Sequence, residues 1–224
     1  MILNHPVFNR EISFNEIQTQ LLVVEHQQFF RKMVFDFCLQ SEGEDGEFIL
    51  YDDTKNSLLH GSDHIRVITD YHGFDLSGRS MQNKLHQYLR TVMDENMKME
   101  SDRLKLNIQD YLQELSEHSD IPITFELFSS MYPLVKAFEV NAVIEGENDI
   151  SALFEYLDIV NFLFENQLHV LVGAMSFYDE KELEELQKFA QYKKYNILII
   201  ENIKRERFGR EGQVTIIDRD LCVI

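Results

Sequence analysis

One stretch of the chain, residues 79–119, contains neither glycine nor proline. Apolar side chains recur in it at three- and four-residue spacing, which is the periodicity of an amphipathic helix. The periodic residues are Met81, Leu85, Leu89, Val92, Met93, Met97, Leu104, Ile108, Tyr111, Leu112 and Leu115. A continuous helix of about 40 residues would be ~60 Å long, which exceeds the width of a small domain. The pattern therefore predicts one long helix, or two in tandem, that projects from the rest of the molecule.

The helical pattern ends at Asp120-Ile121-Pro122, because proline lacks a backbone N–H and clashes with the preceding helical turn. A second helix is expected from about Thr124 to Phe138, disturbed at Pro133. Two antiparallel helices of this kind would form one protruding unit. We therefore assign residues 79–148 to a helical arm domain.

Short apolar runs flank this arm on both sides and are typical of buried strands. Strands are expected over residues 21–25, 47–51, 65–70, 169–174 and 196–201. Helices are expected over residues 28–39, 149–166 and 179 to about 192, the last opening with the capping-box sequence Asp179-Glu180-Lys181-Glu182. Apolar strands bounded by helices predict a mainly parallel sheet that is covered on both faces. The fold class is therefore α/β, with a head domain built from residues 1–78 plus 149–224 and the arm inserted between these parts.

The charge balance is strongly acidic, with 39 Asp and Glu residues against 21 Lys and Arg residues and a formal net charge of -18. Phosphates repel a negative surface, so this balance argues against a simple nucleic-acid binder. DNA binding stays possible if a basic face is segregated from an acidic one, or if divalent cations cover the carboxylates. The acidic residues also have a plainer interpretation, since net charge keeps a protein soluble.

Cellular location is indicated by the cysteines and by the missing targeting signals. Cys38 and Cys222 lie far apart, and neither belongs to a CxxC pair, so we expect free thiols in a reducing cytosol. No apolar run approaches the roughly 18 residues needed to span a membrane. The first residues show no basic region followed by an apolar stretch, so no export signal is visible. The sequence predicts a cytoplasmic protein without a membrane partner.

The turn after the first apolar strand lies where a phosphate-binding loop would be found. Such a loop needs glycines, whose backbone N–H groups approach phosphate, and a Lys-Ser/Thr pair at the start of the helix. Residues 25–32 read EHQQFFRK and contain no glycine. Glu25 would repel a phosphate, and Lys32 is followed by Met33, which offers no hydroxyl for Mg²⁺. We therefore do not expect this turn to hydrolyse a nucleotide.

Other catalytic arrangements are weakly supported. His60 and His64, with Asp63 between them, could be drawn as metal ligands, but they lie in a Gly-Ser loop and suit a solvated turn better. The sequence has no HExxH motif, zinc-finger spacing or GxSxG elbow. A metal-dependent nuclease or an atypical NTPase stays an alternative, but no carboxylates have diagnostic spacing for either.

An acidic cluster occurs where the first arm segment meets the next. Its members are Glu114, Glu117, Asp120 and Glu126. Oxygen ligands from a helix end and the following loop suit Ca²⁺, which accepts flexible coordination. A solvated helix end is the alternative, and composition alone favours it.

Basic residues are also found on the arm, namely Lys84, Arg90, Lys98, Arg103, Lys105 and Lys136. Several have acidic neighbours at helical spacing, as Arg90 and Lys98 do in Asp94, so intrahelical pairing is the plain interpretation. A second basic group follows the last strand, at Lys204, Arg205, Arg207 and Arg210. Neither group has the interleaved aromatic residues of a single-strand stacking platform.

The order of three segments resembles a known family. They are LLVVEHQQFFRKMVFDFC (21–38), IRVITDYHGFDLSG (65–78), which precedes the arm, and HVLVGAMSFYDEKELEELQKFAQYKKYNILIIEN (169–202). Together with the length and the position of the arm, they resemble the ring-forming CRISPR-associated protein of type II-A spacer-acquisition loci. The resemblance extends over nearly the whole chain and is least distinct at residues 1–20 and 203–224.

This resemblance implies properties that spacing alone does not reach. It implies a head similar to a degenerate P-loop ATPase fold, a helical leg and a homotetrameric ring. Such a ring would take double-stranded DNA through its lumen without reading sequence, prefer linear DNA with free ends and depend on Ca²⁺. It would support spacer capture alongside the CRISPR integrase and the RNA-guided effector nuclease, without catalysis of its own.

The resemblance also changes the interpretation of the two charged groups. Glu117, Asp120 and Glu126 become the leading candidates for Ca²⁺ ligands. The basic arm residues become candidates for contacts with DNA phosphates: Lys84, Arg90, Lys98, Arg103, Lys105 and Lys136. A ring would reconcile the net charge with DNA binding, because its outer surface can be acidic while its lumen is basic.

Overall fold

The computed structural model describes residues 1–126, 130–146, 150–204 and 213–224. The chain divides into two compact units. One unit combines Met1–Phe74 with Ile144–Ile224, and we call it the head. The other consists of Asp75–Val143, and we call it the arm. Each unit is described by itself.

A five-stranded sheet forms the centre of the head, with the strand order β6-β7-β8-β3-β9. Its strands are β3 (Thr19–Val24), β6 (Ile65–Ile68), β7 (Leu168–Val172), β8 (Asn196–Glu201) and β9 (Val214–Ile217). All four neighbouring pairs are parallel. The expected mainly parallel α/β sheet is therefore confirmed.

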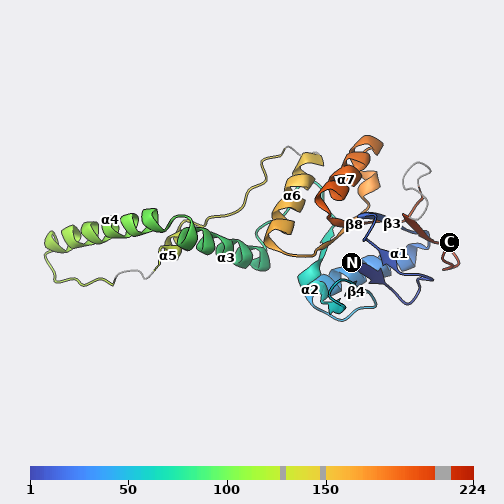
Figure 1. The fold of residues 1–224 in the computed structure, drawn as a ribbon, viewed down its shortest axis with the longest axis horizontal. Helices are drawn as coiled ribbons and strands as arrows, with labels where there is room; N and C mark the ends of the chain where they lie inside the picture. Colours follow the sequence, from blue (N-terminus) through green and yellow to red (C-terminus); the bar gives the residue numbers. More distant parts are fainter. Residues whose placement is uncertain (127–129, 147–149, 205–212) are drawn as a thin grey trace. The chain divides into compact units, whose positions relative to one another are not determined.

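Helices cover both faces of this sheet (Figure 1). The chain leaves β3 through α1 (Gln27–Glu42), crosses to the edge strand β6 and then returns through β7 and β8. On the return, α6 (Ile150–Leu163) precedes β7 and α7 (Glu180–Lys193) precedes β8. Right-handed crossovers that run in opposite directions place their helices on opposite faces. Accordingly, α1 lies on one face, whereas α6 and α7 lie on the other.

A second, antiparallel sheet packs beside α1, with the strand order β2-β1-β4-β5. Its strands are β1 (Ile2–Asn4), β2 (Ile12–Ser13), β4 (Ile49–Asp52) and β5 (Ser57–Leu59). Leu3 and Leu50 from this sheet join one core with Leu22, Leu198 and Ile200 from the parallel sheet. Between the sheets, the rings of Phe37 in α1 and Phe48 are stacked with centroids 3.7 Å apart.

The ends of the head helices have identifiable causes. At the start of α7, the Asp179 carboxylate accepts hydrogen bonds from the N–H groups of Lys181 and Glu182, and Glu182 accepts one from the Asp179 N–H, so the predicted capping box is confirmed. The helix α1 continues to Glu42, three residues beyond the expected end. It stops at Gly43, whose φ of 97° lies in the left-handed region that glycine adopts without strain. Two short helices, α2 (Gly61–His64) and the 3-10 turn η1 (Ala174–Ser176), follow loops in the head.

The arm contains two helices in tandem, α3 (Arg79–Glu95) and α4 (Lys98–Glu117). The helical turn is wider at the break, where the N–H groups of both Asn96 and Met97 donate to the Val92 carbonyl and Met97 thus reaches back five residues. The expected return helix over residues 124–138 is wrong in length, because the only helix that the structure describes there is α5 (Tyr132–Ala137). Pro133 lies in the first turn of α5, where its missing N–H costs nothing, so it begins this helix instead of disturbing it.

Two general predictions can be compared with the described residues. Cys38 and Cys222 are both free thiols, as expected. None of the described helices is both long enough and apolar enough to cross a membrane.

Candidate nucleic-acid interface and related sites

The turn between β3 and α1 is occupied by the protein's own hydrogen bonds. The His26 ring nitrogen Nδ1 accepts from the Phe29 N–H at 3.2 Å, and the Glu25 N–H donates to the Ile217 carbonyl at 2.8 Å. Lys32 does not face this turn as a phosphate-binding lysine would, because its Nζ lies 2.8 Å from Glu47 Oε2. An N-cap side chain thus occupies one of the amides that a phosphate would need.

At the ends of the neighbouring strands β7 and β8, polar side chains are also engaged in hydrogen bonds within the protein. Glu201, at the end of β8, is buried, and its Oε1 accepts from the Met175 N–H at 2.7 Å. The Tyr71 hydroxyl donates to the Val172 carbonyl at 3.1 Å, and burial together with the nearby Glu201 carboxylate raises the pKa of Tyr71. These groups therefore hold the loops together and do not line an open catalytic cleft.

The histidine pair in the Gly-Ser loop does not converge on a common point. His64 donates from Nδ1 to the Asn166 carbonyl at 3.0 Å, whereas His60 is exposed at the start of α2. Across the described part of the chain, no three His, Cys, Asp or Glu side chains are grouped so that they could hold a metal ion. The described residues therefore provide no metal site for a nuclease.

The acidic cluster of the arm is spread over a helix end and an exposed loop. Glu117 is the last residue of α4, and its Oε1 accepts a long 3.5 Å hydrogen bond from Gln113. Asp120 and Glu126 are exposed in the following segment. Because the described residues hold no group of three metal-ligating side chains, these carboxylates do not form a calcium site within one chain. Their assignment as calcium ligands stays a prediction.

Two of the predicted DNA-binding residues are brought together by α4. Lys98 and Lys105 are seven residues apart, which places them on one face of the helix about 10 Å from each other along its axis. Both line a cavity of about 260 Å³. Its other lining residues are Met93, Asp94, Ser101, Asp102, Ser130 and Met131. The cavity thus combines two ammonium groups with two carboxylates and two hydroxyls.

The other predicted basic residues are distributed along the arm. Arg90 Nε lies 3.8 Å from Asp94 Oδ2, in an exposed pair one helical turn apart, so the predicted intrahelical pairing is confirmed here. Lys136 Nζ lies 5.2 Å above the Tyr132 ring, whereas Lys84 and Arg103 are exposed on α3 and α4. In the second basic group, Lys204 is exposed, and Arg205, Arg207 and Arg210 lie outside the described residues.

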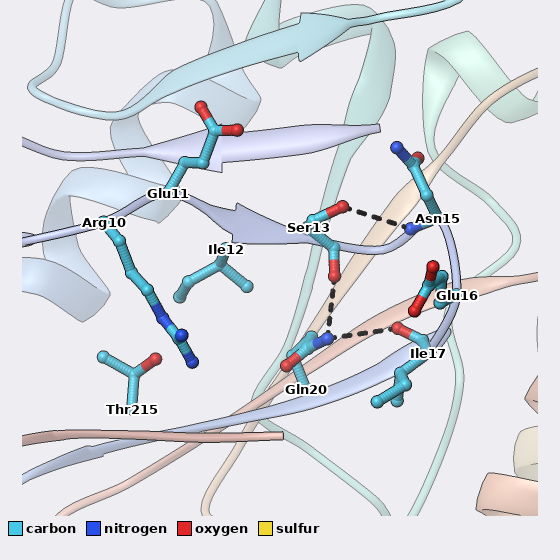
Figure 2. Close-up of a pocket in the computed structure, with 9 residues that line it drawn as sticks. All are labelled: Arg10, Glu11, Ile12, Ser13, Asn15, Glu16, Ile17, Gln20 and Thr215. Carbon is cyan, nitrogen blue, oxygen red and sulfur yellow. Dashed lines mark hydrogen bonds between the residues drawn. The ribbon is translucent and has the colours of Figure 1, made fainter. Parts of the chain in front are cut away.

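The sequence pattern did not indicate a larger cavity of about 600 Å³ in the head (Figure 2). It lies at the amino ends of β3 and β9, whereas the turn at Glu25 follows the carboxyl end of β3. Its residues come from β2, the connection to β3 and the distant strand β9, so no local motif could have revealed it.

The chemistry available in the arm is that of binding. All of its described cations except the half-buried Lys105 are exposed, and they can contact phosphate oxygens. Comparisons with known proteins identify the family of the chain. The sequence profile of the family described as CRISPR-associated protein (Cas_Csn2) matches residues 40–221.

Two individual relatives extend this match. A CRISPR-associated protein Csn2 from Streptococcus agalactiae is 18% identical over 201 residues, covering 89% of this chain and 88% of that protein. The crystal structure of Stu0660 of Streptococcus thermophilus matches with a TM-score of 0.61 at 13% identity, over 97% of this chain and 74% of that chain. This structural similarity shows a shared fold. The family profile spans most of the sequence, and the chain therefore belongs to the Csn2 family of CRISPR-associated proteins.

Proposed function

We propose that this protein binds double-stranded DNA without sequence preference and without catalysis, in support of CRISPR spacer acquisition. Family membership supports the role in acquisition. The observation that carries the DNA-binding part is a set of arm cations at the surface, above all the exposed Lys98 and the half-buried Lys105 on one face of α4. Cations that contact only phosphates give affinity without sequence information.

Self-assembly into a homotetrameric ring is part of the proposal. Within one chain, α4 buries none of its 20 residues. Leu104, Tyr111 and Leu115 recur along one face of this helix and are 46%, 65% and 46% exposed. A helix with an unpartnered apolar stripe gains stability when another surface covers the stripe. In the proposed ring, the surface that covers this stripe belongs to another copy of the chain.

Calcium dependence is the least supported part of the proposal. The ligands that we propose are Glu117, Asp120 and Glu126, which the described part of one chain does not gather into a site. Isothermal titration of the purified protein with Ca²⁺ tests this assignment directly. We expect the triple variant Glu117→Gln, Asp120→Asn, Glu126→Gln to lose the heat of binding. Unchanged binding by this variant would remove these three carboxylates from the proposal.

The proposal also includes the partners of the protein and its cellular location. We propose that the bound DNA is presented to the CRISPR integrase and the RNA-guided effector nuclease, in the cytoplasm that the sequence predicts. The alternatives of a metal-dependent nuclease or an atypical NTPase have no supporting residue set in the described part of the chain. DNA cleavage with Mg²⁺ or Mn²⁺, or ATP turnover, would support an enzyme if a carboxylate substitution abolished it.

A gel-shift experiment tests the central claim. Linear duplexes of unrelated sequence are titrated with the full-length protein at low salt, with Ca²⁺ or with a chelator. We expect comparable affinity for all duplexes, a dependence on Ca²⁺ and weaker binding to circular DNA of the same sequence. Absence of any shift with Ca²⁺ at low salt would refute DNA binding, and strong differences among duplexes would refute the sequence-independent mode.

A further inference from the structure

The head contains a polar pocket that lies outside the arm and has no part in the proposed DNA binding. We call it the β2–β9 pocket, and its volume is about 600 Å³, within the range of ligand-binding sites. It is lined by Arg10, Glu11, Ile12, Ser13, Asn15, Glu16, Ile17, Gln20 and Thr215. Most of these residues are polar, so the pocket suits a polar ligand with several hydrogen-bonding groups.

Gln20 forms the floor of this pocket and is only 6% exposed. Its Nε2 donates to the carbonyl oxygens of Ser13 at 2.7 Å and Ile17 at 3.2 Å. Both amide hydrogens are therefore used, and the amide group is held in one orientation. Figure 2 shows its carbonyl oxygen on the side where Arg10 and Thr215 lie. A fixed acceptor on a buried side chain suits a ligand that brings an N–H group.

The charges of the pocket are separated. The guanidinium of Arg10 points toward Thr215, whereas the Glu16 carboxylate lies beside Ile17 at the other end (Figure 2). The side chain of Glu11 extends away from the guanidinium. No ion pair joins Arg10 to another of the described residues. A complementary ligand would place an acidic group at Arg10 and a basic group near Glu16.

Two strand edges border the pocket. β2 is the outer strand of the antiparallel sheet, and β9 is the outer strand of the parallel sheet. The outer edge of β9 already accepts an extended segment at one point, because Ile216 and Ile224 exchange hydrogen bonds of 3.4 and 2.9 Å. In a parallel ladder alternate residues face opposite neighbours, so Val214 presents its N–H and C=O on this same outer edge. On β2, the outward carbonyl of Ser13 is already used by Gln20 Nε2, so β9 is the strand edge that can bind an extended peptide by strand addition.

We propose that the β2–β9 pocket binds an extended peptide segment of a partner protein, with an acidic side chain at Arg10 and a basic side chain near Glu16. The backbone of the peptide supplies the N–H donor for Gln20 and pairs with the outer edge of β9. A peptide accounts for the fixed amide, the separated charges and the β9 edge together. None of the residues that line the pocket is among the proposed DNA contacts.

Selection of random short peptides displayed on phage tests this proposal, with the immobilised full-length protein as bait. We expect enriched peptides to contain an acidic and a basic residue. The affinity of an enriched synthetic peptide, measured by fluorescence anisotropy, should fall about tenfold or more in Arg10→Glu. Arg219→Glu makes the same change of charge at an exposed head residue outside the pocket and should bind as the unaltered protein does.

Three outcomes would overturn the proposal. They are the absence of any enriched motif, equal binding of the enriched peptides by Arg10→Glu, and loss of linear duplex binding in Arg10→Glu. The last result would assign Arg10 to the DNA-contacting surface. Failure of the unaltered protein to bind DNA would refute the proposed function alone, because peptide binding is measured without DNA.

Discussion

At the scale of single residues, His169 shows how burial fixes a protonation state. It is fully buried on β7, and its Nε2 lies 2.8 Å from the Asn161 amide nitrogen. Because that nitrogen can only donate, Nε2 is the acceptor and the ring is neutral. Burial, with a smaller effect of the Arg66 charge, lowers the pKa of His169 to about 3 from 6.5.

This shift predicts a pH dependence of folding with a definite sign. The unfolded chain binds a proton at His169 below about pH 6.5, whereas the folded chain does not do so until about pH 3. Stability is therefore lost as the pH falls through this window, by at most about 1.4 kcal/mol per pH unit. We expect His169→Gln to flatten the profile between about pH 6.5 and 5 by ~1 kcal/mol, measured by urea unfolding. A profile as steep as that of the unaltered protein would mean that other groups cause it.

At the scale of elements, the close packing of the start of α6 depends on Gly146. A Cβ added at this position would lie 2.8 Å from the Ala152 nitrogen and 2.9 Å from its Cα. The N–H groups of Glu145 and Gly146 also donate to Glu155 Oε2, at 2.7 and 3.1 Å, so this segment cannot shift without losing hydrogen bonds.

We therefore expect Gly146→Ala to lower the free energy of unfolding of the head by about 1–3 kcal/mol, measured by chemical denaturation. Gly73→Ala is the matched control, because a Cβ at Gly73 meets nothing within 4 Å. The control should change stability by less than about 0.5 kcal/mol. Equal effects of both substitutions would show that loss of backbone freedom, and not the contact with Ala152, decides the outcome.

Elements differ in how well the sequence predicts them. Long apolar runs predicted four strands of the parallel sheet, because strands buried on both faces must be apolar throughout. The sequence did not indicate β1, β2, β5 and β9. The first three have only two or three residues, too few for a periodic pattern, whereas β9 has four, as β4 and β6 do. The helix α4 was predicted correctly, but its apolar face is not buried in the chain, because periodicity shows that a face exists and not what covers it.

The candidate sites show the same limit. The sequence alone shows that the turn at Glu25 lacks the glycines and the hydroxyl of a phosphate-binding loop. The engagement of Lys32 by Glu47 and of the Phe29 N–H by His26 required the structure. The grouping of Lys98 with Lys105 follows from helical spacing, whereas the β2–β9 pocket joins residues about 200 positions apart in the chain and could not be inferred locally.

At the scale of the whole molecule, the apolar face of α4 makes a prediction about assembly. Leu104→Glu places a charge on the face that also carries Tyr111 and Leu115. We expect it to lower the molar mass in solution below that of the proposed tetramer, measured by light scattering, because a buried unpaired charge is costly. Leu106→Glu is the matched control, since Leu106 is 59% exposed but lies on a different side of α4. Dissociation by both variants, or by neither, would exclude this face as the specific contact.

The net charge of -18 makes salt dependence the most informative property of the proposed DNA complex. If the whole molecule repels DNA while a few arm cations attract it, the logarithm of affinity falls linearly with the logarithm of salt concentration, with a slope set by the phosphates contacted. Removing Lys98 and Lys105 by the double substitution Lys98→Gln, Lys105→Gln should reduce that slope by about 2 on every duplex tested. Lys181→Gln, Lys188→Gln is the matched control, because it removes two exposed lysines that are also seven residues apart, on α7 of the head. A general electrostatic effect would change both slopes equally, whereas phosphate contacts at α4 change only the first. An unchanged slope in the α4 variant would remove these lysines from the interface.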